Sequence, residues 1–205
     1  MGLAAAPGSA DAVDCYLRLL ERYHRTLDLM SARGLEEVGE KLEDAWAYAA
    51  ALERWAGPGT AIDVGSGAGL PGVVLASAAP SRPLLWTERR RRRATFLGMV
   101  AAHCGLGNVE VVAADVRALD AGRLPEPLAA VTAQAVGDWI ALYSWTRQLH
   151  TDEVVFIARR GPAWKEEVAA LAESISTEPA VLAAEALGRG GTLVVLSVPG
   201  GCRCR

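Results

Sequence analysis

The chain has few of the residues that build disulfide frameworks, metal centres and membrane spans. Its four cysteines are too few and too scattered for a disulfide framework or a zinc site: Cys15, Cys104, Cys202 and Cys204. Its three histidines lie far apart, and none has a Glu-x-x-His partner. No apolar run reaches the ~18 residues that a membrane helix needs, and the N-terminus lacks the basic flank and long apolar core of a signal peptide. We therefore expect a cytoplasmic protein without a metal site or a membrane partner.

Positive charge is also limited. The net charge of −3 argues against a protein whose whole surface grips nucleic acid, but it leaves room for a local basic patch. Lys41 and Lys165 are the only lysines, so arginine carries almost all of the positive charge. With 205 residues, of which 51% are hydrophobic, the chain has ample material for one packed core.

Apolar runs alternate with helical patterns from residue 60 onward. Short strands are predicted over 60–64, 83–87, 108–112, 129–135 and 153–158, with helices over about 89–103, 139–149 and 163–174. This order predicts an α/β fold with a mostly parallel sheet covered on both faces, and the carboxyl ends of its strands meet at one edge. The run 191–198 is expected to be a last, antiparallel strand that pairs with a run near Val181.

The first part of the chain is predicted to be helical. Apolar residues at helical spacing over 10–30 and 35–52 indicate two amphipathic helices, which end at the breaker Gly57-Pro58-Gly59. His24 lies on the apolar face and is interpreted as a core histidine. We expect residues 1–57 to form a helical cap that does not fold alone, residues 58–199 to form the ligand-binding domain, and residues 200–205 to form a tail.

A glycine cluster follows the strand at 60–64. Gly65, Gly67 and Gly69 have the spacing G-x-G-x-G, with Asp63 two residues earlier, whereas the dinucleotide fingerprint is G-x-G-x-x-G. The spacing therefore disfavours a nicotinamide oxidoreductase and resembles the S-adenosylmethionine (SAM) loop of class I methyltransferases, in which the strand-end acid lies near the ammonium group of the ligand. Pro71 suits the first turn of the helix that follows. The expected cofactor-binding residues here are Asp63, Gly65, Ser66, Gly67, Ala68, Gly69, Leu70 and Pro71.

Two further acidic residues follow predicted strands. Glu88 comes nineteen residues after Gly69, near the ~20-residue spacing at which an acid accepts hydrogen bonds from a ribose. Asp115 ends the third strand, where an adenine amine would lie. Each has a simpler interpretation, Glu88 as a solvated strand-end residue and Asp115 as the cap of a short helix.

Several of these features together resemble the small-subunit ribosomal RNA methyltransferase G family, also called GidB. They are the Gly-Ala-Gly-Leu-Pro-Gly loop, the acid followed by basic residues and Phe96-Leu97, the Asn108-Val109 strand and the two leading helices, which together span roughly residues 11 to 198. The resemblance implies a Rossmann-like class I methyltransferase, preceded by a helical cap, that uses SAM and releases S-adenosylhomocysteine. It also implies methyl transfer to N7 of a guanine in small-subunit rRNA. We expect the protein to be a monomer.

The same resemblance assigns further site residues. It places Asp115, Val116 and Gln134 beside the cofactor, and Asp44, Gln134 and Arg160 at the catalytic centre. Gln134 stands where the family has an arginine, and a neutral amide cannot form a charged fork to phosphate or base. Two alternatives therefore stay open: a divergent paralogue that methylates a small molecule, and a non-catalytic relative that binds RNA or the ribosome.

The run Arg89 to Arg93 is the one concentrated positive feature. Five successive helical residues point all round a helix, so they cannot all touch one partner. Cations in a first turn also oppose the helix dipole. This cost favours a phosphate-contact role, although a solvated arginine-rich surface is the simpler interpretation. Arg92 and Arg93 align with a basic pair of the family and, with Arg160, are the predicted RNA contacts.

Overall fold

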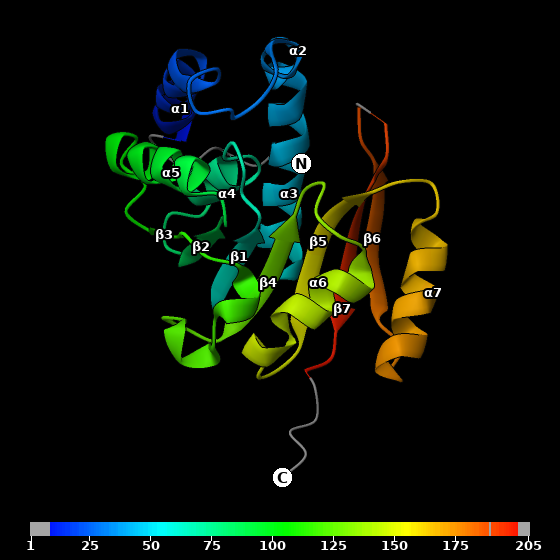
Figure 1. Cartoon of the computed structure of the whole chain (residues 1–205). Helices are drawn as coiled ribbons and strands as arrows, with labels where there is room; N and C mark the ends of the chain where they lie inside the picture. Colours follow the sequence, from blue (N-terminus) through cyan, green and yellow to red (C-terminus); the bar gives the residue numbers. More distant parts are fainter. Residues whose placement is uncertain (1–8, 189, 201–205) are drawn as a thin grey trace.

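Seven strands form one sheet in the order β3-β2-β1-β4-β5-β7-β6 (Figure 1). The computed structural model describes residues 9–188 and 190–200. Strands β1 to β5 are parallel, whereas β7 is antiparallel to both β5 and β6. Their bounds are β1 Thr60–Val64, β2 Leu84–Thr87, β3 Val109–Val112, β4 Leu128–Ala133, β5 Val154–Arg160, β6 Ala180–Ala186 and β7 Thr192–Val198. The predicted fold class, the antiparallel last strand and its pairing near Val181 are confirmed.

Helices cover both faces of the sheet, as the alternation of apolar runs predicts (Figure 1). One face packs against α1 Ser9–Tyr23, α3 Val38–Trp55, α4 Gly72–Ala78 and α5 Arg91–His103. The other packs against α6 Trp139–Thr146 and α7 Trp164–Ile175. In β1 the side chain of Ala61 faces the first layer, and those of Ile62 and Val64 face the second. Burial on both faces explains why most residues of the inner strands are apolar.

The region before β1 differs from the prediction in its bounds. The helix expected over 10–30 ends at Tyr23, and a short helix, α2 Ala32–Glu36, precedes α3. The chain turns at Asp28, whose φ is +52°. Leu29 is nonetheless buried, so the apolar spacing continued through residues that are not helical. His24 is buried, and its Nδ1 lies 2.9 Å from the Glu21 carbonyl oxygen, which fits its interpretation as a core histidine.

Helices α1 and α3 share their core with α4, α5 and the sheet, and a division at residue 57 stays a prediction. Cys15 of α1 and Cys104 at the end of α5 form a disulfide with a Cα–Cα distance of 5.5 Å. No disulfide framework was expected from the sequence, and this single pair forms because α1 and α5 pack together. Cys202, Cys204 and the tail beyond Gly200 lie outside the described residues. Within 9–188 and 190–200, no helix is long and apolar enough to cross a membrane.

Three element boundaries move residues of the expected site. Strand β5 continues to Arg160 rather than ending at Ala158, because its last residues pair with β7. Helix α5 begins at Arg91, so Arg89 and Arg90 precede it and do not belong to one continuous helical run with Arg93. Helix α4 begins at Gly72, which leaves Pro71 as the residue just before it. The connections after β1, β2, β3, β4 and β5 all leave from the same edge of the sheet.

Candidate active site

Two adjoining cavities open at the carboxyl edge of the parallel strands. The larger has a volume of about 790 Å³ and the smaller about 400 Å³. Both are lined by Gly65, Arg93, Ala135 and Val136, so the two cavities share part of their walls. Open α/β sheets bind ligands at this edge, and cavities of this size suit a cofactor together with an acceptor.

The loop between β1 and α4 borders both cavities. Gly65 and Gly67 have φ values of +68° and +56°, which residues with a side chain adopt only with strain. The Gly67 N–H donates to Glu88 Oε2 over 3.1 Å, and the Ser66 hydroxyl donates to the Asp63 carbonyl oxygen over 3.1 Å. The loop is thus held in shape by its neighbours, with its backbone turned toward the cavities.

Glu88 lies at the end of β2 in the wall of the smaller cavity. Its side chain is buried, and its Oε1 accepts a hydrogen bond from the Arg90 N–H over 2.8 Å. Two backbone donors therefore orient the carboxylate, and each oxygen keeps a second lone pair for a ligand. The interpretation as a solvated strand-end residue is wrong, because Glu88 is only 6% exposed.

Asp115 follows β3 and also lines the smaller cavity. Its carboxylate accepts from the Arg117 N–H over 3.0 Å, and the Arg117 guanidinium donates to both oxygens over 2.9 and 2.7 Å. These hydrogen bonds lower the pKa of Asp115 to about 2. Asp115 thus caps the short 3-10 turn that contains Val116, and at the same time lines the cavity with Val116.

Asp63 takes a different position from the one expected. Its side chain is buried and lines neither cavity. The Thr132 hydroxyl donates to Asp63 Oδ1 over 2.8 Å, and a Cβ on Gly72 would come within 3.0 Å of Oδ2. Burial raises the pKa of Asp63 to about 6, against the effect of the Thr132 hydrogen bond. The carboxylate therefore lies beneath the start of α4, and a direct contact with the cofactor stays a prediction.

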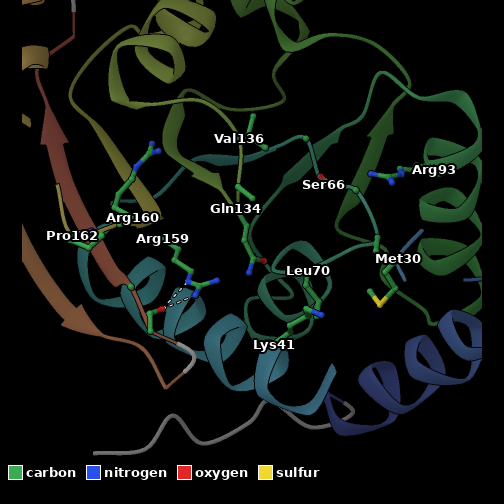
Figure 2. A pocket seen from close by; sticks show the side chains of 17 residues that line it. Met30, Lys41, Ser66, Leu70, Arg93, Gln134, Val136, Arg159, Arg160 and Pro162 are labelled. Atoms are coloured by element: carbon green, nitrogen blue, oxygen red, sulfur yellow. Dashed lines mark hydrogen bonds between the residues drawn. The ribbon is translucent and has the colours of Figure 1, made fainter. Parts of the chain in front are cut away.

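The larger cavity is lined by four basic side chains, those of Lys41, Arg93, Arg159 and Arg160. Among the residues that the structure describes, no acidic side chain lines it. Figure 2 shows the Arg159 guanidinium and the Gln134 amide pointing toward the same space, with Lys41 below them. Arg159 is oriented by two hydrogen bonds to the Gly190 carbonyl oxygen, from Nε over 3.1 Å and from Nη2 over 2.7 Å. Arg93 donates to the Asp28 carbonyl oxygen. The cavity wall therefore favours a negatively charged ligand.

Arg160 points away from this group of side chains (Figure 2). It is buried, with its guanidinium carbon 4.2 Å from the ring centroid of Trp139. Its Nη1 donates to the Gly137 carbonyl oxygen over 2.5 Å, and Glu167 lies 3.7 Å from Nε. Burial lowers the pKa of Arg160. These contacts hold the loop that follows β4 against β5.

The structure brings most of the predicted site residues to the two cavities. The larger is lined by Gly65, Ser66, Gly67, Ala68, Leu70, Arg93, Gln134 and Arg160, and the smaller by Gly65, Glu88, Arg93, Asp115 and Val116. Five predicted residues line neither cavity: Asp44, Asp63, Gly69, Pro71 and Arg92. Asp44 is buried in α3, and Arg92 is exposed on α5.

Sequence reasoning missed Arg159 and gave no site role to Lys41 or Met30, which also line the larger cavity. Arg159 was missed because β5 was expected to end at Ala158. The adjacent pair Arg159-Arg160 at a strand end was the available signal. Met30 and Lys41 flank α2, which the apolar spacing did not reveal.

The smaller cavity is lined by acceptor groups of the kind that a ribose or an adenine amine requires. Glu88 offers carboxylate oxygens at the end of β2, and Asp115 and Val116 also line the cavity. Trp145 contributes an aromatic side chain to the same cavity. The glycine loop leads from there into the larger cavity, so the chain can hold SAM along the carboxyl edge of β1, β2 and β3.

Comparison with known proteins agrees with this arrangement. The chain is 34% identical to a ribosomal RNA small subunit methyltransferase G of Halorhodospira halophila over 166 residues, 80% of this chain and 76% of that protein. It is 31% identical to one of Pseudomonas aeruginosa over 182 residues, 87% of this chain and 81% of that protein. The fold is similar to that of a SAM-dependent methyltransferase from Aquifex aeolicus, with a TM-score of 0.58, 15% identity, and coverage of 77% of this chain and 91% of that one.

The family match covers the helices before β1 and strands β1 to β6 of the sheet that carries the two cavities. Residues 10–189, which include every residue that lines the smaller cavity, match the family described as rRNA small subunit methyltransferase G, or GidB. On this match, the chain belongs to the GidB family of rRNA small subunit methyltransferases G.

Proposed function

We propose that this protein is a SAM-dependent methyltransferase that acts on N7 of a guanine in small-subunit rRNA. The observation that carries the proposal is the larger cavity, where the glycine loop that borders the cofactor cavity meets a wall of basic side chains. An RNA acceptor brings phosphates next to its reacting base, and Lys41, Arg93 and Arg159 are placed to attract them. The family to which the chain belongs supports the same acceptor class.

In this proposal, different residues bind the adenosine and methionine parts of SAM. Bound SAM would supply the electrophilic methyl group of a sulfonium ion. Glu88, Asp115 and Val116 would hold the adenosine part, and Gly65 and Gly67 would hold the methionine part against the loop. Gln134, at the end of β4, would lie where the methyl group meets its acceptor.

The acceptor chemistry fits a site without an obvious general base. Guanine N7 carries a lone pair and no proton, so the enzyme has to align the base rather than deprotonate it. Asp44, which the family resemblance places at the catalytic centre, is buried in α3 and lines neither cavity. Alignment by Gln134 and the basic side chains is then the main contribution that we expect from the protein.

The test is transfer of isotopically labelled methyl groups from SAM to small ribosomal subunits and naked rRNA that lack the modification. Nuclease digestion then identifies the labelled nucleoside. Label in 7-methylguanosine is the expected result, and subunits that already carry the modification serve as the acceptor control. Label in another nucleoside would refute the N7 assignment.

A small anionic acceptor is the second candidate. Met30 and Lys41, on either side of α2, close part of the larger cavity, and Gln134 leaves the end of β4 neutral. Tight SAM binding in calorimetry without transfer to RNA would favour this candidate. A relative that binds RNA without turnover would show RNA binding but no transfer to any acceptor.

The proposal also includes a cytoplasmic location and a monomeric state, both of which are consistent with a ribosomal substrate.

A further inference from the structure

One buried hydroxyl joins the ends of two neighbouring strands beside the larger cavity. Tyr48 of α3 is fully buried, and its hydroxyl donates to the Ala133 carbonyl oxygen over 3.0 Å. The same hydroxyl accepts a hydrogen bond from the Arg159 N–H over 2.7 Å. Ala133 is the last residue of β4, and Arg159 is the next-to-last residue of β5. A side chain from the helical layer thus takes part in the sheet.

The Tyr48 hydroxyl stands where a hydrogen bond of the sheet is expected. Strands β4 and β5 are parallel, and their pairing ends with Ala133 opposite Ala158. If the ladder continued, the Arg159 N–H would donate directly to the Ala133 carbonyl oxygen. The inserted hydroxyl replaces that bond by two bonds in series. Beyond this point β5 pairs only with β7, and β4 and β5 separate.

The ends of β4 and β5 separate at the wall of the larger cavity. Gln134 follows Ala133 directly, and the side chains of Gln134 and Arg159 point toward the same space (Figure 2). Tyr48 fixes the backbone of Arg159, and the Gly190 carbonyl oxygen accepts from its guanidinium. The position of the Arg159 side chain relative to Gln134 is therefore set by Tyr48 at one end and by Gly190 at the other.

We propose that Tyr48 is a positioning residue for the acceptor half of the active site. Its hydroxyl holds the ends of β4 and β5 apart, which sets the spacing between the Gln134 amide and the Arg159 guanidinium. The cofactor half is formed by the connections after β1, β2 and β3, which Tyr48 does not touch through this hydroxyl. This inference rests on the proposed function, since it assigns the larger cavity to the acceptor.

The test compares Tyr48→Phe with a matched control, Tyr16→Phe, in the full chain. Tyr16 is also fully buried, and its hydroxyl has no hydrogen-bond partner among the described residues. Both variants lose one buried oxygen and keep the ring. For Tyr48→Phe we expect kcat/KM for small ribosomal subunits to fall by about tenfold or more, with S-adenosylhomocysteine affinity kept within about twofold. Tyr16→Phe should change neither quantity beyond that range.

Hydrogen–deuterium exchange measures the geometry without depending on activity. In Tyr48→Phe, peptides that cover 133–138 and 159–162 should change their exchange, and those of the glycine loop at 65–71 should not. Exchange and kinetics that match those of Tyr16→Phe would overturn the proposal, and so would an equal loss of cofactor and acceptor binding. If the wild-type protein transfers no methyl group to rRNA, the proposed function fails. Unchanged exchange at 133–138 and 159–162 would then still refute the role of Tyr48.

Discussion

The buried carboxyl of Asp63 should make the fold less stable as the pH rises from acidic to neutral. Burial raises the pKa of Asp63 from 3.8 to about 6, although the hydroxyl of Thr132 favours the ionised form. The folded chain therefore holds this proton more tightly than the unfolded chain does. The contribution of the neutral carboxyl is fully present below pH 3.8 and is lost as the pH rises through 6.

The size of this effect follows from the shift in the pKa of Asp63. About two pKa units correspond to ~3 kcal/mol of unfolding free energy. The side chain is 1% exposed, so solvent screens the effect little. This is a substantial part of the ~5–15 kcal/mol that a typical domain has in total.

The wild-type stability curve alone would hide the effect, because His150 acts in the opposite direction over the same range. Burial lowers the pKa of His150 from 6.5 to about 4, so the folded chain favours the neutral imidazole. Its contribution is present above pH 6.5 and is lost as the pH falls through 4. The two slopes have similar size and opposite sign.

Comparison with Asp63→Asn isolates the carboxyl, since every other titrating group is common to both proteins. Denaturation in urea should be followed at several pH values from about 4 to 8. We expect the unfolding free energy of Asp63→Asn, relative to wild type, to rise by about 2 kcal/mol between pH 4 and pH 7.5, because part of the total of ~3 kcal/mol is already lost at pH 4. The variant Thr132→Val should move the midpoint of this change to higher pH. A flat difference curve would refute the interpretation of Asp63 as a carboxyl whose ionisation opposes folding.

Three further changes test the cofactor cavity and the disulfide. Gly67→Leu should abolish most SAM affinity in calorimetry and keep the fold, whereas Gly105→Leu, at a similar φ of +69° and away from both cavities, should keep the affinity; equal effects would contradict the loop assignment. Glu88→Gln should weaken SAM binding by about 1.5–3 kcal/mol, as for a lost charge-assisted hydrogen bond, and an effect within error would make Glu88 a bystander. Reductant should lower the unfolding free energy by about 4–5 kcal/mol, because Cys15–Cys104 closes a loop of 89 residues. The unfolding free energy of the variant Cys15→Ser should not respond to reductant. If the wild-type value is also unchanged by reductant, the disulfide does not form.

The sheet could be predicted from the sequence because its inner strands are buried on both faces. Runs such as those in β1, β4 and β5 consist mostly of apolar residues, and each strand is followed by a glycine or a polar residue. The glycine spacing and Glu88 then indicate the cofactor edge, because parallel strands must end together. Each of these features is encoded in a short stretch of sequence, so it can be recognised without knowing which distant segments pack together.

The positions that could not be predicted depend on contacts between distant segments. Strand alternation places the Asp63 side chain on the face beneath α4, opposite to Ile62 and Val64, and its expected contact with the cofactor stays a prediction. The extent of β5 depends on its pairing with β7, so the sequence did not show that Arg159 continues the strand. The Cys15–Cys104 pair depends on α1 packing against α5, which no spacing along the chain encodes.

Helix α3 supplies two residues that affect the larger cavity in different ways. Lys41, in its first turn, contributes a positive charge to the wall, and Tyr48, two turns later, keeps the ends of β4 and β5 apart. The smaller cavity has no residue of α3 in its wall. Changes at Lys41 and Tyr48 should therefore alter which acceptor is methylated and how fast, and leave SAM binding nearly unchanged. On the proposed function, helix α3 contributes directly to the acceptor site and does more than cover one face of the sheet.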